Sequence, residues 1–328
     1  MSFLLSNDKY MPSKNKLLLG IEIGGSKLQL VAAETPGSIL RRQRLTVEPG
    51  ESALDIRKHI TAALAEWKGT KWKAAGVGFG GPVDWKTGRV HCSHHVAGWD
   101  GMDLGGWLST LIDAPAAIEN DTNLAALAEV RRGAGTGCSP VFYTNSGSGV
   151  GGGLVIEGEI YHGAPPGEAE VGHVRLTPSG PTVEECCSGW AVDRKVREYC
   201  ACSPSGPLRT LVAQSPGREA RHLKGALLAG DAAAKNIVDE TAGALAFALS
   251  HVVHLFHPSM VILGGGLSLI GEPWRESVAR ALPQYLMKAF LPGPQIRLAA
   301  LGEDVVPIGA LLLVASTGNP DTSDHFSD

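Results

Sequence analysis

The sequence lacks a long apolar run, a strong charge of one sign and a regular cysteine framework. Its longest apolar run, near GALLLVAS, falls far short of the roughly 20 residues that span a membrane. A formal net charge of −4 offers no basic footprint for nucleic acid or an anionic membrane. The opening MSFLLSNDKYMPSKNK has no basic start followed by an apolar core, so no secretory signal is expected. The six irregularly spaced cysteines favour reduced thiols in a cytoplasmic protein.

What is present describes a folded globular chain. The 328 residues are 44% hydrophobic and 19% charged, and this length suits two domains. The 42 glycines indicate many tight turns and places where backbone approaches a ligand closely.

Two glycine-rich hairpins are the first notable elements. KLLLGIEIGGSKLQLVAAE places two apolar runs around Gly24-Gly25-Ser26-Lys27, which predicts a β-hairpin. PVFYTNSGSGVGGGLVIEGEIYHG repeats this arrangement about one domain later. The likeness suggests an ancient duplication.

Helices and further strands complete the predicted order. Residues 52–67 present one apolar helical face, and AAGVGFGGPVD predicts a strand that enters a glycine-rich loop. In AAIENDTNLAALAEVRRG we expect a strand, a cap at Asp121 or Thr122, and a helix ending at Gly133. The remaining expectations are helices over 231–256 and 272–290, strands in SMVILGGGLS and QIRLAAL, and a last helix in PIGALLLVAS.

The glycine motifs are tested first as nucleotide sites. GSGVGG, residues 147–152, matches G-x-G-x-x-G, but a strand-like alternation follows it where a dinucleotide site needs a helix. No P-loop motif is present. A glycine hairpin can still bind phosphate through backbone N–H groups at Gly24, Gly25, Gly147 and Gly149, with hydroxyl groups from Ser26 and Ser148. LGGG at 263–266 suits a nucleotide base or ribose.

Seven motifs in order carry a resemblance to a known family. They are EIGGSK, GVGFGGPVD, IENDTNLAALAE, GSGVGGGLV, GEAEVGH, SGWAV and VILGGGLS. Together they resemble the ROK family of sugar kinases, within the actin-like ATPase superfamily, over residues 17–316.

The resemblance implies an α/β protein with the two-domain actin-like ATPase (ribonuclease H-like) fold, whose mixed sheets, flanked by helices, enclose a central cleft. The N-terminal domain would cover 1–120 and be joined by the C-terminal helix at about 305–328, and the other domain would cover 121–304. Dimers are common in such families, so a homodimer is allowed.

The resemblance also implies site residues. Asp121 would be the general base, and Glu22 would lie near Mg²⁺. Sugar ligands would be Gly81, Asn120, Glu170, His173 and Glu184. ATP would contact Gly24, Gly25, Ser26, Lys27, Gly147, Ser148, Gly149, Gly264, Gly265 and Gly266.

Elementary chemistry agrees with these roles. An alcohol is a poor nucleophile, so a carboxylate should accept its proton as it attacks phosphorus. A carboxylate at a helix N-terminus is expected to stay ionised at neutral pH. Taken alone, Asp121 reads as a plain helix cap, and His173 as a structural histidine.

Three departures from the family pattern stand out. Glu22 and Ser26 occupy positions where the family usually has aspartate and threonine, and His95 stands where a sugar-loop asparagine is usual. The family's C-x-C-G zinc segment is missing after His173. We therefore expect no structural zinc, although His173 with Cys186, Cys187, Cys200 and Cys202 forms a competing zinc set.

The sequence thus predicts a cytoplasmic, ATP- and Mg²⁺-dependent, glucokinase-like kinase that phosphorylates a hexose hydroxyl. The alternatives are a catalytically weak sugar-binding relative and a sugar-responsive transcriptional regulator without its DNA-binding module. The identity of the sugar and the choice between ATP and polyphosphate stay open.

Overall fold

The computed structural model describes residues 16–316 apart from 94–95, 166, 168 and 204. His95 and the last twelve residues of the predicted C-terminal helix therefore lie outside the described residues. A five-stranded mixed sheet occupies the first part of the chain, in the order β3-β2-β1-β4-β7. Its strands are β1 (Leu17–Ile23), β2 (Lys27–Ala33), β3 (Ile39–Thr46), β4 (Trp72–Phe79) and β7 (Ala116–Asn120).

A second five-stranded sheet has the order β10-β9-β8-β11-β12. Its strands are β8 (Val141–Ser146), β9 (Val150–Ile156), β10 (Glu159–Ile160), β11 (Met260–Gly264) and β12 (Gln295–Leu298). In both sheets an antiparallel three-stranded meander is followed by two parallel strands. The shared order and directions support the duplication hypothesis.

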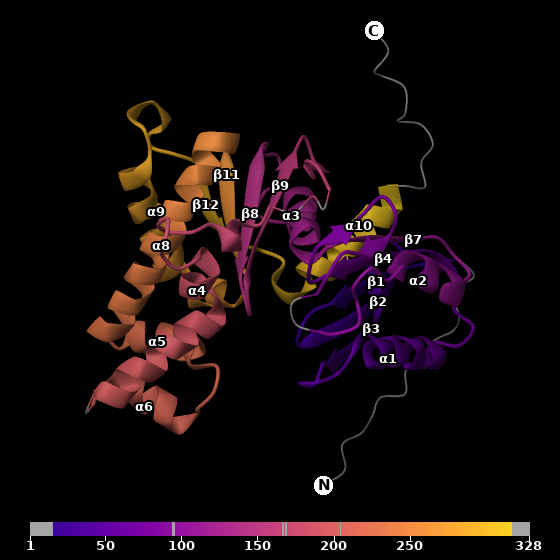
Figure 1. Ribbon diagram of the computed structural model, residues 1–328, viewed down its shortest axis with the longest axis horizontal. Coiled ribbons are helices and arrows are strands. Elements are labelled where there is room, and N and C mark those ends of the chain that lie inside the picture. The colour runs from indigo at the N-terminus through magenta and orange to yellow at the C-terminus, as the bar shows by residue number, and fades with distance from the viewer. Residues whose placement is uncertain (1–15, 94–95, 166, 168, 204, 317–328) are drawn as a thin grey trace.

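Helices cover the outer faces of both sheets (Figure 1). α1 (Ala53–Glu66) and α2 (Leu104–Ile112) pack on the first sheet, beside the small hairpin of β5 (Val83–Asp84) and β6 (Arg89–Val90). α4 (Val183–Cys187), α8 (Ala232–Phe256) and α9 (Glu272–Ala281) pack on the second sheet. α5 (Gly189–Cys202), α6 (Pro207–Gln214) and α7 (Leu223–Leu228) pack on these helices and on one another, and α5 and α6 extend away from the sheet (Figure 1). Six short 3₁₀ segments connect described elements, namely Val171–His173, Glu219–His222, Gly266–Ile270, Leu282–Tyr285, Lys288–Phe290 and Gly302–Asp304.

Two helices lie between the sheets and connect them (Figure 1). α3 (Asp121–Arg132) leaves β7 of the first sheet and packs on β8 and β9 of the second, whereas α10 (Val305–Ser316) follows β12 and packs on β1 and β4. The two helices also pack on each other. A Cβ at Gly309 would lie 2.2 Å from the Leu124 carbonyl oxygen, and one at Gly76 would lie 1.9 Å from that of Ala310. Glycine is therefore required for this close packing. The predicted division of domains after Asn120 stays a prediction.

The structure corrects three expectations about local elements. Asn120, and neither Asp121 nor Thr122, caps α3 by accepting hydrogen bonds from the backbone of Thr122 and Asn123. The predicted helix over 272–290 ends as an α-helix at Ala281, and a 3₁₀ segment containing Pro283 follows, because proline cannot donate the next helical hydrogen bond. The arginine-rich edge strand β3 was not predicted from the sequence.

None of the helices between residues 16 and 316 combines the length and hydropathy required of a membrane span, including the 25-residue α8.

Candidate functional site

A cleft of about 770 Å³ lies where the glycine-rich turns of the two sheets approach each other. All of the predicted site residues except Gly264 line it. They are Glu22, Gly24, Gly25, Ser26, Lys27, Gly81, Asn120, Asp121, Gly147, Ser148, Gly149, Glu170, His173, Glu184, Gly265 and Gly266. The structure thus brings together residues separated by more than 240 positions.

The Asp121 carboxyl group lies where β7 turns into α3. Asp121 is the first residue of α3, and its Oδ1 accepts a hydrogen bond from the Thr122 hydroxyl at 3.1 Å. Burial in the cleft, with a smaller contribution from the Glu22 charge, raises the pKa of Asp121 to about 7. At neutral pH Asp121 is therefore only partly ionised, less than a helix N-terminus alone would favour, because desolvation outweighs the helix dipole.

Glu22, near the end of β1, is held by two neighbours. Its carboxylate lies 2.9 Å from the Lys27 ammonium and accepts a hydrogen bond from Gln29 Nε2 at 3.2 Å. Burial raises the pKa of Glu22, and the Lys27 charge opposes that shift. Gln29 is fully buried, and its Oε1 accepts from Arg42 at 2.9 Å and Arg44 at 2.6 Å. The side-chain amide therefore has a fixed orientation toward Glu22.

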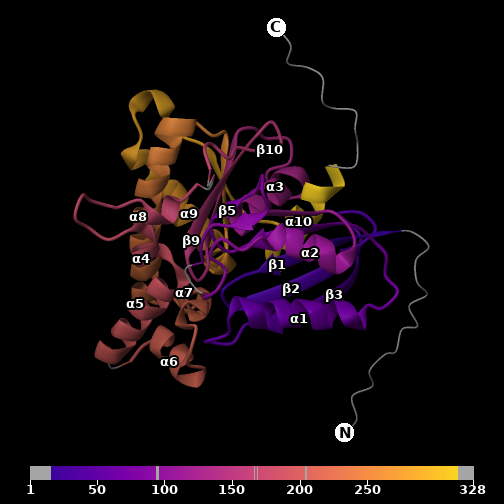
Figure 2. The same cartoon turned by 45° about the vertical axis from the view of Figure 1, so that its right-hand side comes forward.

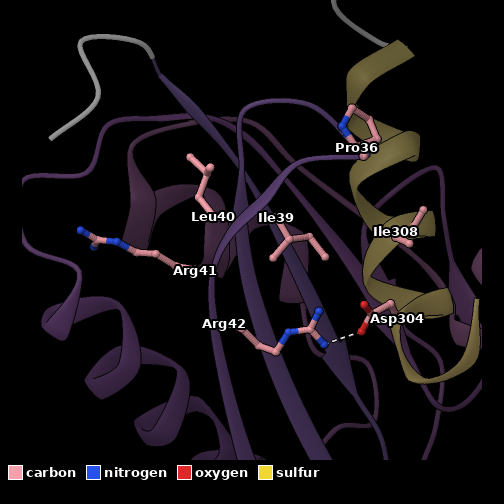
Figure 3. A pocket seen from close by; sticks show the side chains of 8 residues that line it. Pro36, Ile39, Leu40, Arg41, Arg42, Asp304 and Ile308 are labelled. Atoms are coloured by element: carbon pink, nitrogen blue, oxygen red, sulfur yellow. Dashed lines mark hydrogen bonds and ion pairs between the residues drawn. The ribbon is translucent and has the colours of Figure 1, made fainter. Parts of the chain in front are cut away.

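The arginines extend this network to the outer edge of the first sheet. Arg42 pairs with Asp304, the residue directly before α10 (Figure 3). Arg44 pairs with Glu303, which also lines the main cleft. A separate hollow of about 450 Å³ lies beside the Arg42–Asp304 pair, and none of the predicted site residues lines it. The charged network thus joins β1, β2 and β3 to the two acidic residues directly before α10.

The two hairpin turns offer fewer free donors than the sequence suggested. Gly24 N–H donates to the Lys27 carbonyl oxygen, and Gly147 N–H donates to that of Gly149, both at 2.9 Å. The expectation that these two N–H groups are open to phosphate is wrong, since they close their own turns. The candidate donors that stay are the backbone groups of Gly25, Ser26, Ser148 and Gly149.

The third glycine loop, residues 263–266, lies partly in the cleft and partly in the protein interior. Gly265 has φ +76°, and a Cβ there would lie 2.6 Å from the backbone nitrogen of Ser146. Gly264 does not line the cleft, because it packs against Tyr143, whose hydroxyl oxygen would lie 2.0 Å from an added Cβ. Gly264 therefore supports the loop, and Gly265 and Gly266 face the cleft.

The predicted sugar ligands Glu170, His173 and Glu184 lie on one wall of the cleft. Glu170 precedes the 3₁₀ segment that contains His173, and their side chains approach to 3.9 Å. Glu184 belongs to α4, and its Oε2 accepts from the Val150 N–H at 2.9 Å. A Cβ at Gly149 would lie 2.4 Å from this carboxylate. Glu184 thus ties α4 to the second glycine turn.

All six cysteines are free thiols. Burial raises the pKa of the Cys187 thiol to about 12, and its Sγ donates to the Thr241 carbonyl oxygen at 3.5 Å. Within the described ranges, no group of three or more His, Cys, Asp or Glu side chains is arranged to hold a metal ion. The zinc expectation stays a prediction.

Sequence reasoning missed the wall of the cleft that is formed by the end of β12, the segment between β12 and α10, and the start of α10. This wall includes Leu298, Ala299, Ala300, Gly302, Glu303, Val305 and Val306. Glu129 of α3 fixes it, because Oε1 accepts from the Ala300 and Leu301 N–H groups at 2.8 and 2.9 Å. The acidic pair Glu303-Asp304 before an apolar helix was the available signal. Thr122, Asn145, Ser268 and Leu269 also line the cleft and were missed.

Known proteins resemble this chain over most of its length. The glucokinase of Thermotoga maritima is 30% identical over 312 residues, covering 90% of this chain and 96% of that protein. The kanosamine kinase of Amycolatopsis mediterranei is 31% identical, covering 87% and 91%. The structure of a ROK family glucokinase from Streptomyces griseus, in complex with glucose and AMPPNP, matches with a TM-score of 0.81 at 29% identity. That match covers 92% of this chain and 99% of the glucokinase.

The structural match confirms the predicted α/β fold of the actin-like ATPase type, with mixed sheets and flanking helices. The ROK family model matches residues 18–317, nearly the whole chain. This protein belongs to the ROK family.

Proposed function

We propose that this protein is a glucokinase-like kinase that transfers the γ-phosphoryl group of ATP to a hexose hydroxyl group. The observation that carries the proposal is the Asp121 carboxyl group, which lies in a cleft lined by two glycine-rich turns and has a pKa raised to about 7. A general base works best when its pKa lies near the operating pH. Asp121 can therefore accept the proton of the attacking hydroxyl group.

The residues of the cleft fit Mg²⁺, which supplies charge neutralisation when bound. Magnesium takes oxygen ligands and usually relies on one or two carboxylates together with substrate phosphates. Glu22 and Asp121 are two carboxylates of one cleft, and after burial the Glu22 charge is the next contribution to the raised pKa of Asp121. Glu22 would hold the ion, through water, and Lys27 would face the phosphates.

ATP is proposed to lie across the two hairpin turns. Gly25, Ser26, Ser148 and Gly149 would donate to its phosphate oxygens, while Gly24 and Gly147 shape the turns. Gly265 and Gly266 would lie against the adenosine, supported by Gly264. Binding of AMPPNP by the glucokinase from S. griseus supports ATP as the phosphoryl donor to test first.

A hexose is proposed to bind to Gly81, Asn120, Glu170, His173 and Glu184. Asn120 already donates to the Gly81 carbonyl oxygen at 3.3 Å, so these two residues form one edge of the site. Glu184 uses Oε2 for Val150 N–H, which makes Oε1 the candidate acceptor for a sugar hydroxyl. The glucokinase relatives support glucose as the first substrate to test.

The proposal extends to domains, assembly and compartment. The domains would be 1–120 with the helix from 305, and 121–304, closing over the substrates to exclude water. We propose a homodimer that acts in the cytoplasm, where ATP is available and free thiols persist.

The test is the Asp121→Asn variant. Asparagine keeps hydrogen bonding and removes the proton acceptor, so sugar affinity should stay within about tenfold while turnover is lost. In the wild type, kcat/KM should rise with pH through about 7. Calorimetry measures sugar binding, and coupled detection of ADP with a hexose panel measures turnover. Near wild-type turnover in the variant would contradict the proposal. Wild-type protein that binds sugar without turnover would be a sugar-binding relative.

A further inference from the structure

Glu119, the residue before the proposed sugar ligand Asn120, is a buried carboxylate with 1% of its surface exposed. Its Oε1 accepts from the Asn120 N–H at 2.8 Å and from Asn123 Nδ2 at 3.0 Å. Its Oε2 lies 2.6 Å from Nε2 of His162. A buried polar group costs free energy unless it is hydrogen-bonded. The imidazole is the third hydrogen-bonding partner of this buried side chain, and the only one on its Oε2 among the contacts of the described residues.

His162 reaches Glu119, on the first sheet, from a segment next to the second sheet. It lies two residues after β10, a strand of the second sheet, whereas Glu119 lies on β7 of the first. Figure 2 shows β5, β10 and α3 in one region of the molecule, and β10 contacts α3 while β5 contacts β7. The His162–Glu119 pair thus joins the two halves beside the turn that begins α3.

The imidazole of His162 is also held by an aromatic side chain that stacks on its ring face. Trp85, which directly follows β5, stacks on His162 with ring centroids 4.0 Å apart and an interplanar angle of 8°. The stack sets the plane of the imidazole, and the carboxylate sets the direction of Nε2. His162 is therefore held from two directions by elements associated with the first sheet.

Glu119 in turn fixes the β7–α3 turn. It holds the Asn120 N–H, while the Asn120 side chain accepts from Thr122 N–H at 2.8 Å and Asn123 N–H at 3.1 Å. Asp121 is the next residue along this turn. Displacement of a reacting group by about 1 Å can cost roughly a hundredfold in rate.

We infer that His162 is a positioning residue, which acts through Glu119 to hold Asn120 and Asp121 and ties their orientation to the second half of the protein. This role rests on the proposed function of Asp121, while the contacts themselves do not. His162 does not line the cleft, so it acts indirectly on a bound sugar.

Two variants separate the contacts of His162. His162→Phe keeps a ring to stack on Trp85 and loses the hydrogen bond to Glu119, whereas His162→Gln retains a donor. With glucose and ATP, we expect kcat of His162→Phe to fall at least tenfold while KM for ATP changes less than about threefold. His162→Gln should recover most of the lost rate. His251→Phe, at an exposed histidine of α8, is the matched control.

Hydrogen exchange tests the inference without any turnover. In ligand-free protein, His162→Phe should increase amide exchange in the peptide covering 118–124, and His162→Gln and His251→Phe should leave it close to wild type. Unchanged exchange in His162→Phe would overturn the inference, whatever happens to kcat. Failure of the wild-type protein to phosphorylate any sugar would refute the proposed function instead, and the exchange result would still decide whether His162 holds this turn.

Discussion

Replacing Asp121 with asparagine should stabilise the ligand-free protein at alkaline pH more than at acidic pH. Burial, and to a lesser extent the charge of Glu22, raises the pKa of Asp121 to about 7, whereas an unfolded chain titrates its aspartates near about 3.9. Between these values the folded protein binds a proton that the unfolded chain has released. The stabilising contribution of protonated Asp121 is therefore fully present below about 3.9 and is lost as the pH rises through about 7.

The size of the effect follows from the shift. Each pH unit below the folded pKa adds about 1.36 kcal/mol to the unfolding free energy. At pH 5, two units below that pKa, protonation of Asp121 therefore stabilises the folded wild type by about 2.7 kcal/mol relative to pH 8.5. The side chain is partly accessible from the cleft, so we expect about 1 to 3 kcal/mol. Asparagine is neutral throughout and lacks this dependence.

Urea unfolding at pH 5, 6, 7 and 8.5, with EDTA and without sugar or nucleotide, measures the difference in unfolding free energy between wild type and Asp121→Asn. Asp113→Asn, at an exposed aspartate after α2, is the control and should show no such trend. A wild-type-minus-variant difference that stays constant from pH 5 to 8.5 would refute the reasoning. It would mean that Asp121 is already ionised at pH 5.

Three further predictions address packing and metals. Gly309→Ala should destabilise the protein by more than about 2 kcal/mol in urea unfolding, because its Cβ would lie 2.2 Å from the Leu124 carbonyl oxygen. The control Gly243→Ala, in an open helical position, should be neutral or stabilising by up to about 1 kcal/mol. Equal effects of the two substitutions would contradict this account. Gln29→Leu should raise the Mg²⁺ concentration for half-maximal turnover roughly tenfold, because Glu22 loses an orienting donor; an unchanged Mg²⁺ titration would argue against that role. Elemental analysis of protein purified without added zinc should find well under one zinc per chain, and one tightly held zinc would overturn the expectation.

Local patterns in the sequence were sufficient for most of the elements. The glycine hairpins at 24–27 and 147–149 and the long apolar helix over 232–256 follow from short-range preferences. The edge strand β3 was missed because its alternation is weak, ILRRQRLT, and it is stabilised by pairing with β2. The break after Ala281 shows the opposite error, in which an apolar helical pattern was followed past a proline.

The candidate site divides in the same way. The sequence by itself determined which residues could do the chemistry, because carboxylates, glycine turns and their order along the chain are local properties. Only the tertiary structure decided the protonation, the hydrogen bonding and the neighbours of these residues. Desolvation in the cleft sets the pKa of Asp121, closure within each turn removes Gly24 and Gly147 as donors, and contacts across 43 positions join His162 to Glu119. These properties depend on burial and on distances between segments far apart in the chain, which no local pattern records.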